Sequence, residues 1–281
     1  MRTVATVLMW LVTTVLLALA IPAVWAQHNL VDGAGYAALA RTAAADPELQ
    51  SAMAAELTTQ VGLLGLDVDS TIVSRIAAAY TASSAFPGQF ASASGFAHRW
   101  LFTDTIPASV DPQGRLVVDL APMLSDTAFV QTLRDYNITP PSALPIPLTD
   151  NASELVRRGS LREVGMWAPW VSVGLAVLAA ASALLTIYLA RRRGRILAAL
   201  GVSALVVGAS GWAAIEFAQR YVRKILGETT GNARRIAEVM VTAIQSSMHQ
   251  WLNITLIIGG GLVIVGVIVG LLSSLAGSGS R

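Results

Sequence analysis

Four long apolar segments constrain the fold of this 281-residue chain more than any other feature. A helix that spans a membrane needs about 20 predominantly apolar residues, and four segments meet that condition: residues 3–26, 167–190, 196–217 and 251–276. Charged residues make up 13% of the chain, about half the share in a typical soluble domain. The sequence therefore predicts an integral membrane protein and argues against both an ordinary cytosolic enzyme and a disordered chain.

The loop between the second and third segments indicates how the chain is oriented. Residues 191–195 read Arg-Arg-Arg-Gly-Arg, and short loops rich in Arg and Lys stay in the cytoplasm. Arg2 and Arg281 then fall on the same side, so both termini are predicted to be cytoplasmic. Residues 27–166 and 218–250 are predicted to be extracytoplasmic. Five basic residues in 218–250 oppose this orientation, but the arginine loop is shorter and denser.

The predicted domains follow the edges of the apolar segments. They are a first transmembrane helix (1–26), an extracytoplasmic domain (27–166), a second transmembrane helix (167–190), a cytoplasmic arginine loop (191–195), a third transmembrane helix (196–217), an extracytoplasmic helical hairpin (218–250), a fourth transmembrane helix (251–276) and a cytoplasmic tail (277–281). The first helix is longer than the apolar region of a signal peptide, which favours an uncleaved anchor. Cleavage after Ala26 is the alternative.

The extracytoplasmic domain carries 14 acidic and 8 basic residues, a net charge of −6. Helix-start signals and apolar spacing predict helices over 33–45, from Asp46-Pro47 onward, after Asp69 and over 87–102. The β-branched segment 115–120 predicts a strand paired with the proline-rich segment 144–148, with a crossover helix over 123–136. Residues 151–165 are predicted to be helical. The predicted fold is mainly α: a four-helix transmembrane bundle with a small α-rich (α+β) domain that holds one short strand pair.

A series of short motifs in this order resembles a known family. The series is Ala23-Val24-Trp25-Ala26, Asp32 with Tyr36, Asp46-Pro47, Ala85-Phe86, Ala97-His98, Val118-Asp119-Leu120-Ala121-Pro122, a Trp/Pro-rich second span and an arginine-rich turn. This order is similar to that of uncharacterised four-span integral membrane proteins of high-GC actinobacteria, over most of the first 195 residues. The resemblance implies a topology but no activity.

His98 and Asp119 are the polar candidates of the extracytoplasmic domain. Histidine titrates near neutral pH, so the pair could respond to protons or contact a ligand. The alternative, which we favour, is that His98 packs on a helix and Asp119 bonds at a strand end. The chain has no cysteine and three histidines, without the spacing of a helical metal pair. No metal, cofactor or catalytic residue is therefore predicted.

Two further groups of residues are candidates for interaction. The external hairpin carries a basic collar, Arg220, Arg223, Lys224, Arg234 and Arg235, which could dock on the acidic domain or contact lipid or glycan phosphates. Gly266 and Gly270 form a small-xxx-small pair. It could serve an oligomer or pack against the chain's own spans, and we favour the second. Glu216 is explained by an ion pair with Arg220, four residues later.

The predicted function is non-enzymatic. A polytopic membrane protein that displays a helical domain suits an interaction, assembly or accessory role toward another envelope or membrane protein. The bilayer is a predicted partner, nucleic acid is not, and a homo-oligomer stays open. A lipid or small-molecule transport accessory or sensor is the first alternative, which needs an apolar pocket. An envelope enzyme that uses His98 and Asp119 is the second, which needs those residues to meet in a cleft.

Overall fold

The computed structural model describes residues 2–63, 69–103, 117–119, 145–147, 159–190, 193–226 and 231–278. The chain divides into two compact units, and each is built from segments that lie far apart in the sequence. Unit 1 comprises residues 1–28, 167–223 and 245–281, and unit 2 comprises residues 29–166 and 224–244. Each of the two units is described by itself below.

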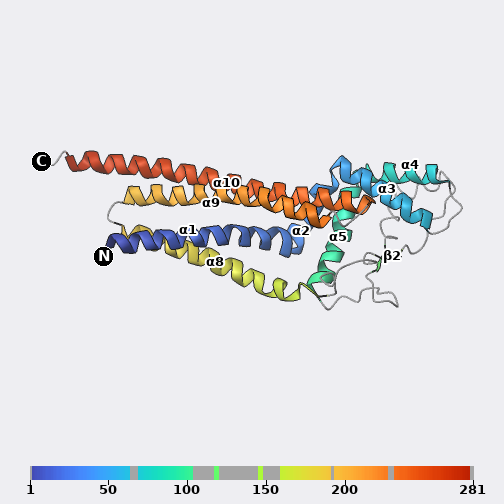
Figure 1. The fold of residues 1–281 in the computed structure, drawn as a ribbon, viewed down its shortest axis with the longest axis horizontal. Helices are drawn as coiled ribbons and strands as arrows, with labels where there is room; N and C mark the ends of the chain where they lie inside the picture. Colours follow the sequence, from blue (N-terminus) through green and yellow to red (C-terminus); the bar gives the residue numbers. More distant parts are fainter. Residues whose placement is uncertain are drawn as a thin grey trace. The chain divides into compact units, whose positions relative to one another are not determined.

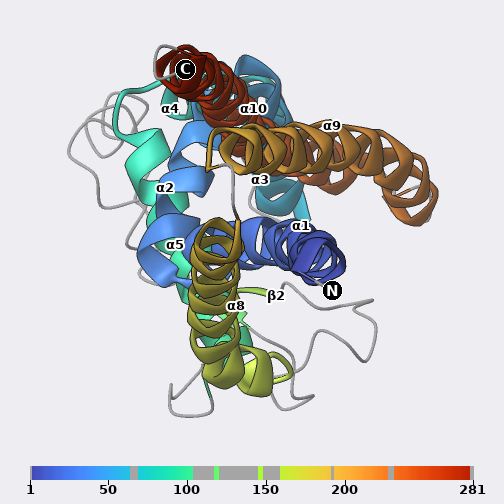
Figure 2. The same ribbon diagram turned by 90° about the vertical axis from the view of Figure 1, so that its left-hand side faces the viewer.

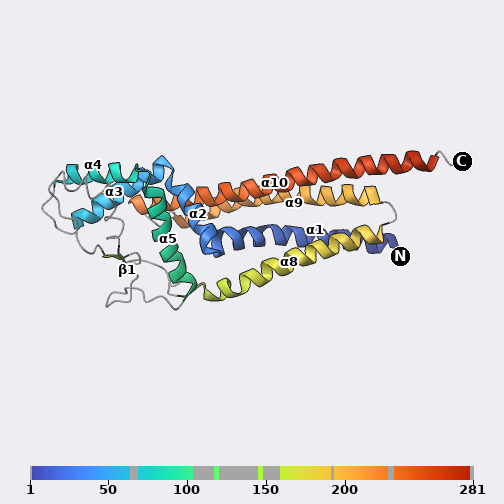
Figure 3. The same ribbon diagram turned by 180° about the vertical axis from the view of Figure 1, so that it is seen from behind.

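Unit 1 consists of long apolar helices. The four helices that contribute to it are α1 (Arg2–Ala26), α8 (Arg162–Leu189), α9 (Arg193–Leu226) and α10 (Gly231–Ser278). The first few residues of α8, the last residues of α9 and the start of α10 belong to unit 2. Figures 1 and 3 show α9 running alongside α10, and Figure 2 looks along the helices. All four contain stretches long and apolar enough to cross a membrane. The prediction of four helices able to span a membrane is therefore confirmed.

The helices are longer than the apolar segments from which they were predicted. α10 has 48 residues and is about 72 Å long at 1.5 Å per residue, whereas a bilayer core is about 30 Å thick. α9 likewise continues past residue 217 to Leu226. Hydropathy marks only the part of a helix that fits in lipid, and the polar residues beyond it, such as Gln219 and Arg220, are good helix formers.

The backbone is irregular directly after α1 and directly before α8. After Ala26 the helix widens into a π-helix, η1 (Gln27–Val31). α8 begins at Arg162, and residues 159–161 before it form a turn in which Gly159 has a φ of +68°. The helix predicted over 151–165 is therefore wrong at residues 159–161, because a left-handed residue cannot continue a right-handed helix. Residues 151–158 lie outside the described residues.

The described part of unit 2 contains four shorter helices, and capping side chains explain where the first three begin. They are α2 (Gly33–Ala44), α3 (Pro47–Leu63), α4 (Ser70–Thr81) and α5 (Phe86–Phe102). Asp32 accepts from Gly35 N at 3.2 Å, Asp46 from Glu48 N at 2.8 Å and Asp69 from Thr71 N at 2.7 Å. These bonds satisfy N–H groups that the first turn of a helix leaves unpaired. The bond from Thr71 also lowers the pKa of Asp69.

The core of unit 2 joins α2–α5 to the first part of α10. Phe86 and Leu49 are fully buried at its centre, and Val239 of α10 is buried with them. Three further side chains of α10 pack against this cluster: Ile236, Met240 and Ala243. The hydroxyl of Tyr80 donates to Gln89 at the edge of the core. Residues of α2–α5 and of the start of α10 therefore build one hydrophobic core.

Two three-residue strands also lie in unit 2. β1 (Val117–Asp119) pairs antiparallel with β2 (Pro145–Pro147), with Val118 opposite Ile146. The sequence predicted that these segments pair without giving their relative direction, which is antiparallel. The crossover helix itself, over 123–136, falls outside the described residues.

Candidate functional site

Hydroxyl side chains hold α1 against α8 and α9 inside unit 1. Thr14 Oγ1 lies 2.8 Å from Ser203 Oγ, and Thr13 Oγ1 lies 3.4 Å from Thr186 Oγ1. Trp10 Nε1 donates to the Ala199 carbonyl at 3.0 Å. Thr13, Thr186 and Ser203 are all 0% exposed. Hydrogen bonds of this kind stabilise helix association in lipid, where apolar burial between helices supplies little.

Hydroxyls of this cluster also have a carbonyl of their own helix within hydrogen-bond distance. Thr13 Oγ1 lies 2.8 Å from Met9 O, Thr186 Oγ1 lies 2.7 Å from Ser182 O and Ser203 Oγ lies 3.2 Å from Ala199 O. A hydroxyl has one proton, so in each interhelical pair one hydroxyl donates to its partner and the other donates within its own helix. No donor is left unsatisfied, so the cluster can be buried at small cost. The apolar pattern of the sequence does not reveal this cluster. The signal was present as Thr and Ser inside otherwise apolar segments, but single polar residues there do not reveal which helices meet.

Glycines spaced seven residues apart bring α9 and α10 into close contact. The seam consists of Gly194, Gly201 and Gly208 on α9 and of Gly259 and Gly266 on α10. A Cβ on Gly266 would lie 2.7 Å from Gly194 O and 2.8 Å from Ala198 Cα, closer than packed atoms approach. A Cβ on Gly270 would meet nothing within 4 Å. Gly266 thus packs against the chain's own α9, whereas Gly270 leaves room beside it.

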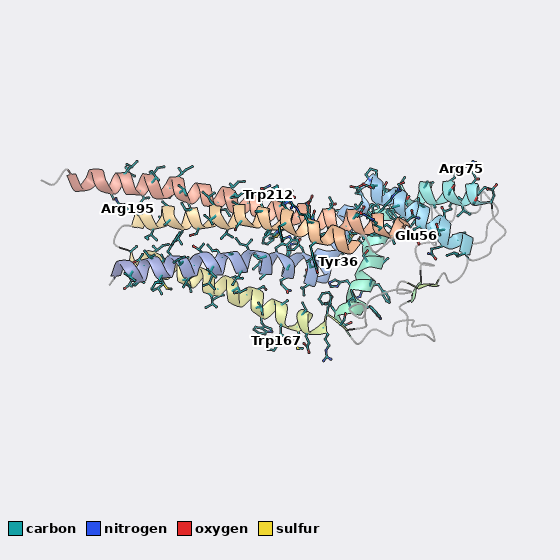
Figure 4. The ribbon with its side chains drawn as sticks, viewed as in Figure 1. Tyr36, Glu56, Arg75, Trp167, Arg195 and Trp212 are labelled. Carbon is teal, nitrogen blue, oxygen red and sulfur yellow. The ribbon has the colours of Figure 1, made fainter. Side chains whose placement is uncertain are left out.

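Aromatic side chains mark the ends of α8. Trp167 and Trp170 are exposed near its start, and Tyr188 is exposed near its end; Trp167 is labelled in Figure 4. From Trp170 to Tyr188 the helix rises about 27 Å, close to the thickness of a bilayer core. Trp and Tyr favour the two interfaces of a membrane. Their spacing on α8 fits the position of a transmembrane segment.

A second group of rings connects α10 to α1 and α9 within unit 1. Trp25 Nε1 donates to Ser247 Oγ at 3.2 Å. Trp212, labelled in Figure 4, stacks on His249 with ring centroids 3.8 Å apart and donates to Asn253 Oδ1 at 3.2 Å. Gln219 and Gln245 are hydrogen-bonded at 3.0 Å. This polar and aromatic layer is suited to the region where a bundle leaves the apolar part of a bilayer.

His98 lies on α5 at the centre of three stacked rings in unit 2. Its ring centroid is 4.7 Å from that of Tyr36 and 4.4 Å from that of Phe102. His98 is 6% exposed, and its Nε2 lies 2.8 Å from the Leu30 carbonyl oxygen in η1. A carbonyl only accepts, so Nε2 carries the proton. The buried Nδ1 has no hydrogen-bond partner in the described part of the chain.

The described contacts of the His98 ring are packing contacts and one hydrogen bond to the backbone. Both faces are covered, and its one described polar contact is to the backbone. Tyr36 is largely buried as well, and burial raises the pKa of its phenol. The end of α5 is further tied to the turn before α8, because Gly159 N donates to Trp100 O at 3.1 Å and Leu161 N donates to Leu101 O at 3.0 Å. His98 and its neighbours therefore join three segments of unit 2.

Asp119, the second polar candidate, ends β1. Its side chain lies outside the described residues, so a meeting of His98 with Asp119 stays a prediction. Among the described residues, no group of three or more His, Cys, Asp or Glu is placed to hold a metal ion.

The structure describes three side chains of the basic collar: Arg220, Arg234 and Arg235. Arg234 Nε donates to Glu238 Oε1 at 2.7 Å on its own helix, so its charge is engaged locally. Arg235 and Arg220 are exposed, and the side chains of Arg223 and Lys224 lie outside the described residues. Between α10 and α3, Asn232 donates to Glu56 in a long bond of 3.5 Å. The remaining described contacts of α10 with unit 2 are apolar.

Glu216 does not form the ion pair expected from the sequence. Glu216 and Arg220 are both exposed on α9, and Arg234–Glu238 is the ion pair found among the described residues. An exposed i, i+4 pair contributes only a few tenths of a kcal/mol. The gain is small enough for both side chains to remain solvated.

Comparisons with known proteins identify no relative. The chain matches no protein-family model, and neither curated proteins nor solved structures give a match. The resemblance to four-span actinobacterial membrane proteins therefore stays a prediction.

Proposed function

We propose that the chain is a multi-pass protein of the cytoplasmic membrane that displays unit 2, an α-rich domain with one short strand pair, on the extracytoplasmic side. Its role is non-enzymatic: unit 2 interacts with another envelope or membrane protein in assembly or as an accessory subunit. The observation that carries the topology is the core shared by residues 29–166 and the start of α10. Segments that follow the first and third spans lie on the same side of a membrane, so they can share a core.

The non-enzymatic role is supported by the surroundings of His98. A general acid or base must be within hydrogen-bond reach of its substrate. The rings of Tyr36 and Phe102 cover both faces of His98, and Leu30 O occupies its Nε2. These contacts favour a structural role for His98.

The orientation, with both termini in the cytoplasm, is tested by cysteine labelling, because the chain contains no cysteine. Arg195→Cys and Arg75→Cys are suitable positions, since both side chains are exposed and are labelled in Figure 4. Gly194 is unsuitable, because a Cβ there would meet the backbone of α10. In intact cells a membrane-impermeant maleimide should label residue 75 and spare residue 195. Labelling of residue 195 alone would reverse the topology.

The first helix is proposed to remain attached as an anchor. Thr13 and Thr14 bond to α8 and α9, and Trp25 is buried. Cleavage after Ala26 would remove these contacts from the bundle. The mass of the purified protein should include residues 1–26. A mature protein that begins at Gln27 would contradict the anchor while leaving the side of unit 2 unchanged.

The interaction role is tested by crosslinking in cells. A photoreactive residue at exposed positions of unit 2, such as Ser51 or Arg75, should capture one recurrent membrane or envelope protein. A matched position on the lipid-facing side of α8, Leu184, should not capture it. Absence of any recurrent partner from both positions of unit 2 would count against the proposal.

A further inference from the structure

Arg220 is a cation without an acidic partner at one end of unit 1. It lies on α9, its side chain is exposed, and no ion pair or hydrogen bond of it is found in the described part of the chain. The other described charged side chains of unit 1 are Glu216, one turn earlier, and Arg195, near the opposite end of α9.

Two exposed rings share this surface of α9. Phe217 is 77% exposed and Tyr221 is 68% exposed. Phe217 lies three residues before Arg220 and four residues before Tyr221, so its ring is a neighbour of both side chains on the helix surface. Arg220 and Tyr221 are adjacent in sequence and flank Phe217. We call Phe217, Arg220 and Tyr221 the cationic–aromatic face.

The cationic–aromatic face lies where α9 should leave the apolar part of a bilayer. About 20 helical residues cross the hydrocarbon core, and counting from Arg195 brings α9 to the region of residue 215. Phe217 then lies at the boundary, and Arg220 and Tyr221 lie at headgroup level. This step rests on the proposed function, because it requires that α9 spans a membrane.

We propose that the cationic–aromatic face binds the phosphate of an anionic phospholipid in the leaflet on the side of unit 2. The guanidinium donates to the phosphate oxygens in the forked geometry that suits Arg. The two rings pack against the glycerol and the upper acyl chain, where aromatic side chains are favoured. The carboxylate of Glu216 opposes the anion, so it limits the affinity.

The proposal is tested on the full-length protein by native mass spectrometry after titration with phosphatidylglycerol or with phosphatidylcholine. One juxtamembrane cation strengthens binding to anionic lipid about fivefold. Arg220→Gln should therefore weaken phosphatidylglycerol binding about fivefold and leave phosphatidylcholine binding unchanged. Arg220→Lys should retain part of the preference, because it keeps the charge and loses the fork. Glu216→Gln should strengthen phosphatidylglycerol binding.

Arg75→Gln is the matched control, since Arg75 is an exposed arginine of α4 in unit 2 and is not part of the basic collar. It should leave binding of both lipids unchanged. Equal binding by the wild type and Arg220→Gln, or equal loss of both lipids, would overturn the proposal. So would displacement of the lipid by inorganic phosphate at equal concentration. A reversed result in the cysteine labelling would change only the leaflet, because both lipids are offered without regard to side.

Discussion

Tyr36 gives unit 2 a dependence on alkaline pH. Burial raises the pKa of its phenol above the ordinary value of 10.0, so the unfolded chain ionises first. The stabilisation is complete below pH 10 and is lost as the pH rises through the raised pKa. Tyr36→Phe should flatten the fall in unfolding free energy above pH 10, measured by urea unfolding in detergent. Tyr188→Phe, at an exposed position, should retain the wild-type slope; equal slopes for all three proteins would contradict the expectation.

Gly266 and Gly270 provide a pair of neighbouring substitutions with opposite expectations. An added Cβ at position 266 meets Gly194 O and Ala198 Cα of α9, whereas position 270 is open. Overpacking of this kind costs about 1–3 kcal/mol. Gly266→Ala should lower the midpoint of thermal unfolding in detergent, and Gly270→Ala should leave it nearly unchanged. Equal unfolding midpoints for Gly266→Ala and Gly270→Ala would show that α9 and α10 can move apart at position 266 without loss of stability.

The hydroxyl contacts between helices call for a double-mutant cycle. Thr14 and Ser203 lie 2.8 Å apart on α1 and α9. Interhelical hydrogen bonds in membranes average about 0.6 kcal/mol. Thr14→Val and Ser203→Ala should therefore show a coupling energy of about that size in unfolding free energy. Thr255→Val with Ser203→Ala is the control, because the hydrogen bond of Thr255 in the described part of the chain goes to Trp251 O of its own helix. A coupling energy equal to that of the control would show that the hydrogen bond between Thr14 and Ser203 does not stabilise the packing of α1.

The helices of unit 2 were readable from the sequence because their start signals are local. Asp32, Asp46 and Asp69 each stand directly before the first residue of a helix. The turn at Gly159 was not readable in the same way. Its left-handed φ is fixed by bonds to the end of α5, far away in sequence. Gly159 alone does not distinguish a helix end from an interior glycine.

The candidate site was predicted less well than the helices. Sequence alone gave His98 as a packed residue but not the Tyr36 and Phe102 rings that cover it. Charge left open whether the basic collar docks on the acidic domain or contacts phosphates, and it did not indicate that Arg234 pairs within its own helix or that Val239 is buried in the core of unit 2. Apolar burial is stronger than exposed ion pairing. Small residues such as Gly266 likewise indicate a packing face on a helix, but they do not indicate which other helix packs against it.

At the scale of the whole molecule, unit 2 is a domain assembled from two separate parts of the chain. Residues 29–166 supply α2–α5, and α10 supplies Val239 with Ile236, Met240 and Ala243. Full burial of one Val, Ile or Met side chain is worth about 1.5–3 kcal/mol. Small domains are stable by only about 5–15 kcal/mol. Loss of the α10 contribution should therefore remove a large share of the stability of unit 2.

This dependence can be measured by separating the two parts. Residues 29–166 expressed alone should unfold at a lower urea concentration, with less cooperativity, than a mixture with a peptide of residues 231–244. The peptide should raise the midpoint in proportion to the logarithm of its concentration, since it binds the folded state alone. A Val239→Asn peptide should fail to do so, because the core does not accept an unpaired amide. The same unfolding midpoint for residues 29–166 alone, with the wild-type peptide and with the Val239→Asn peptide would contradict this expectation. It would show that residues 29–166 fold to full stability without α10.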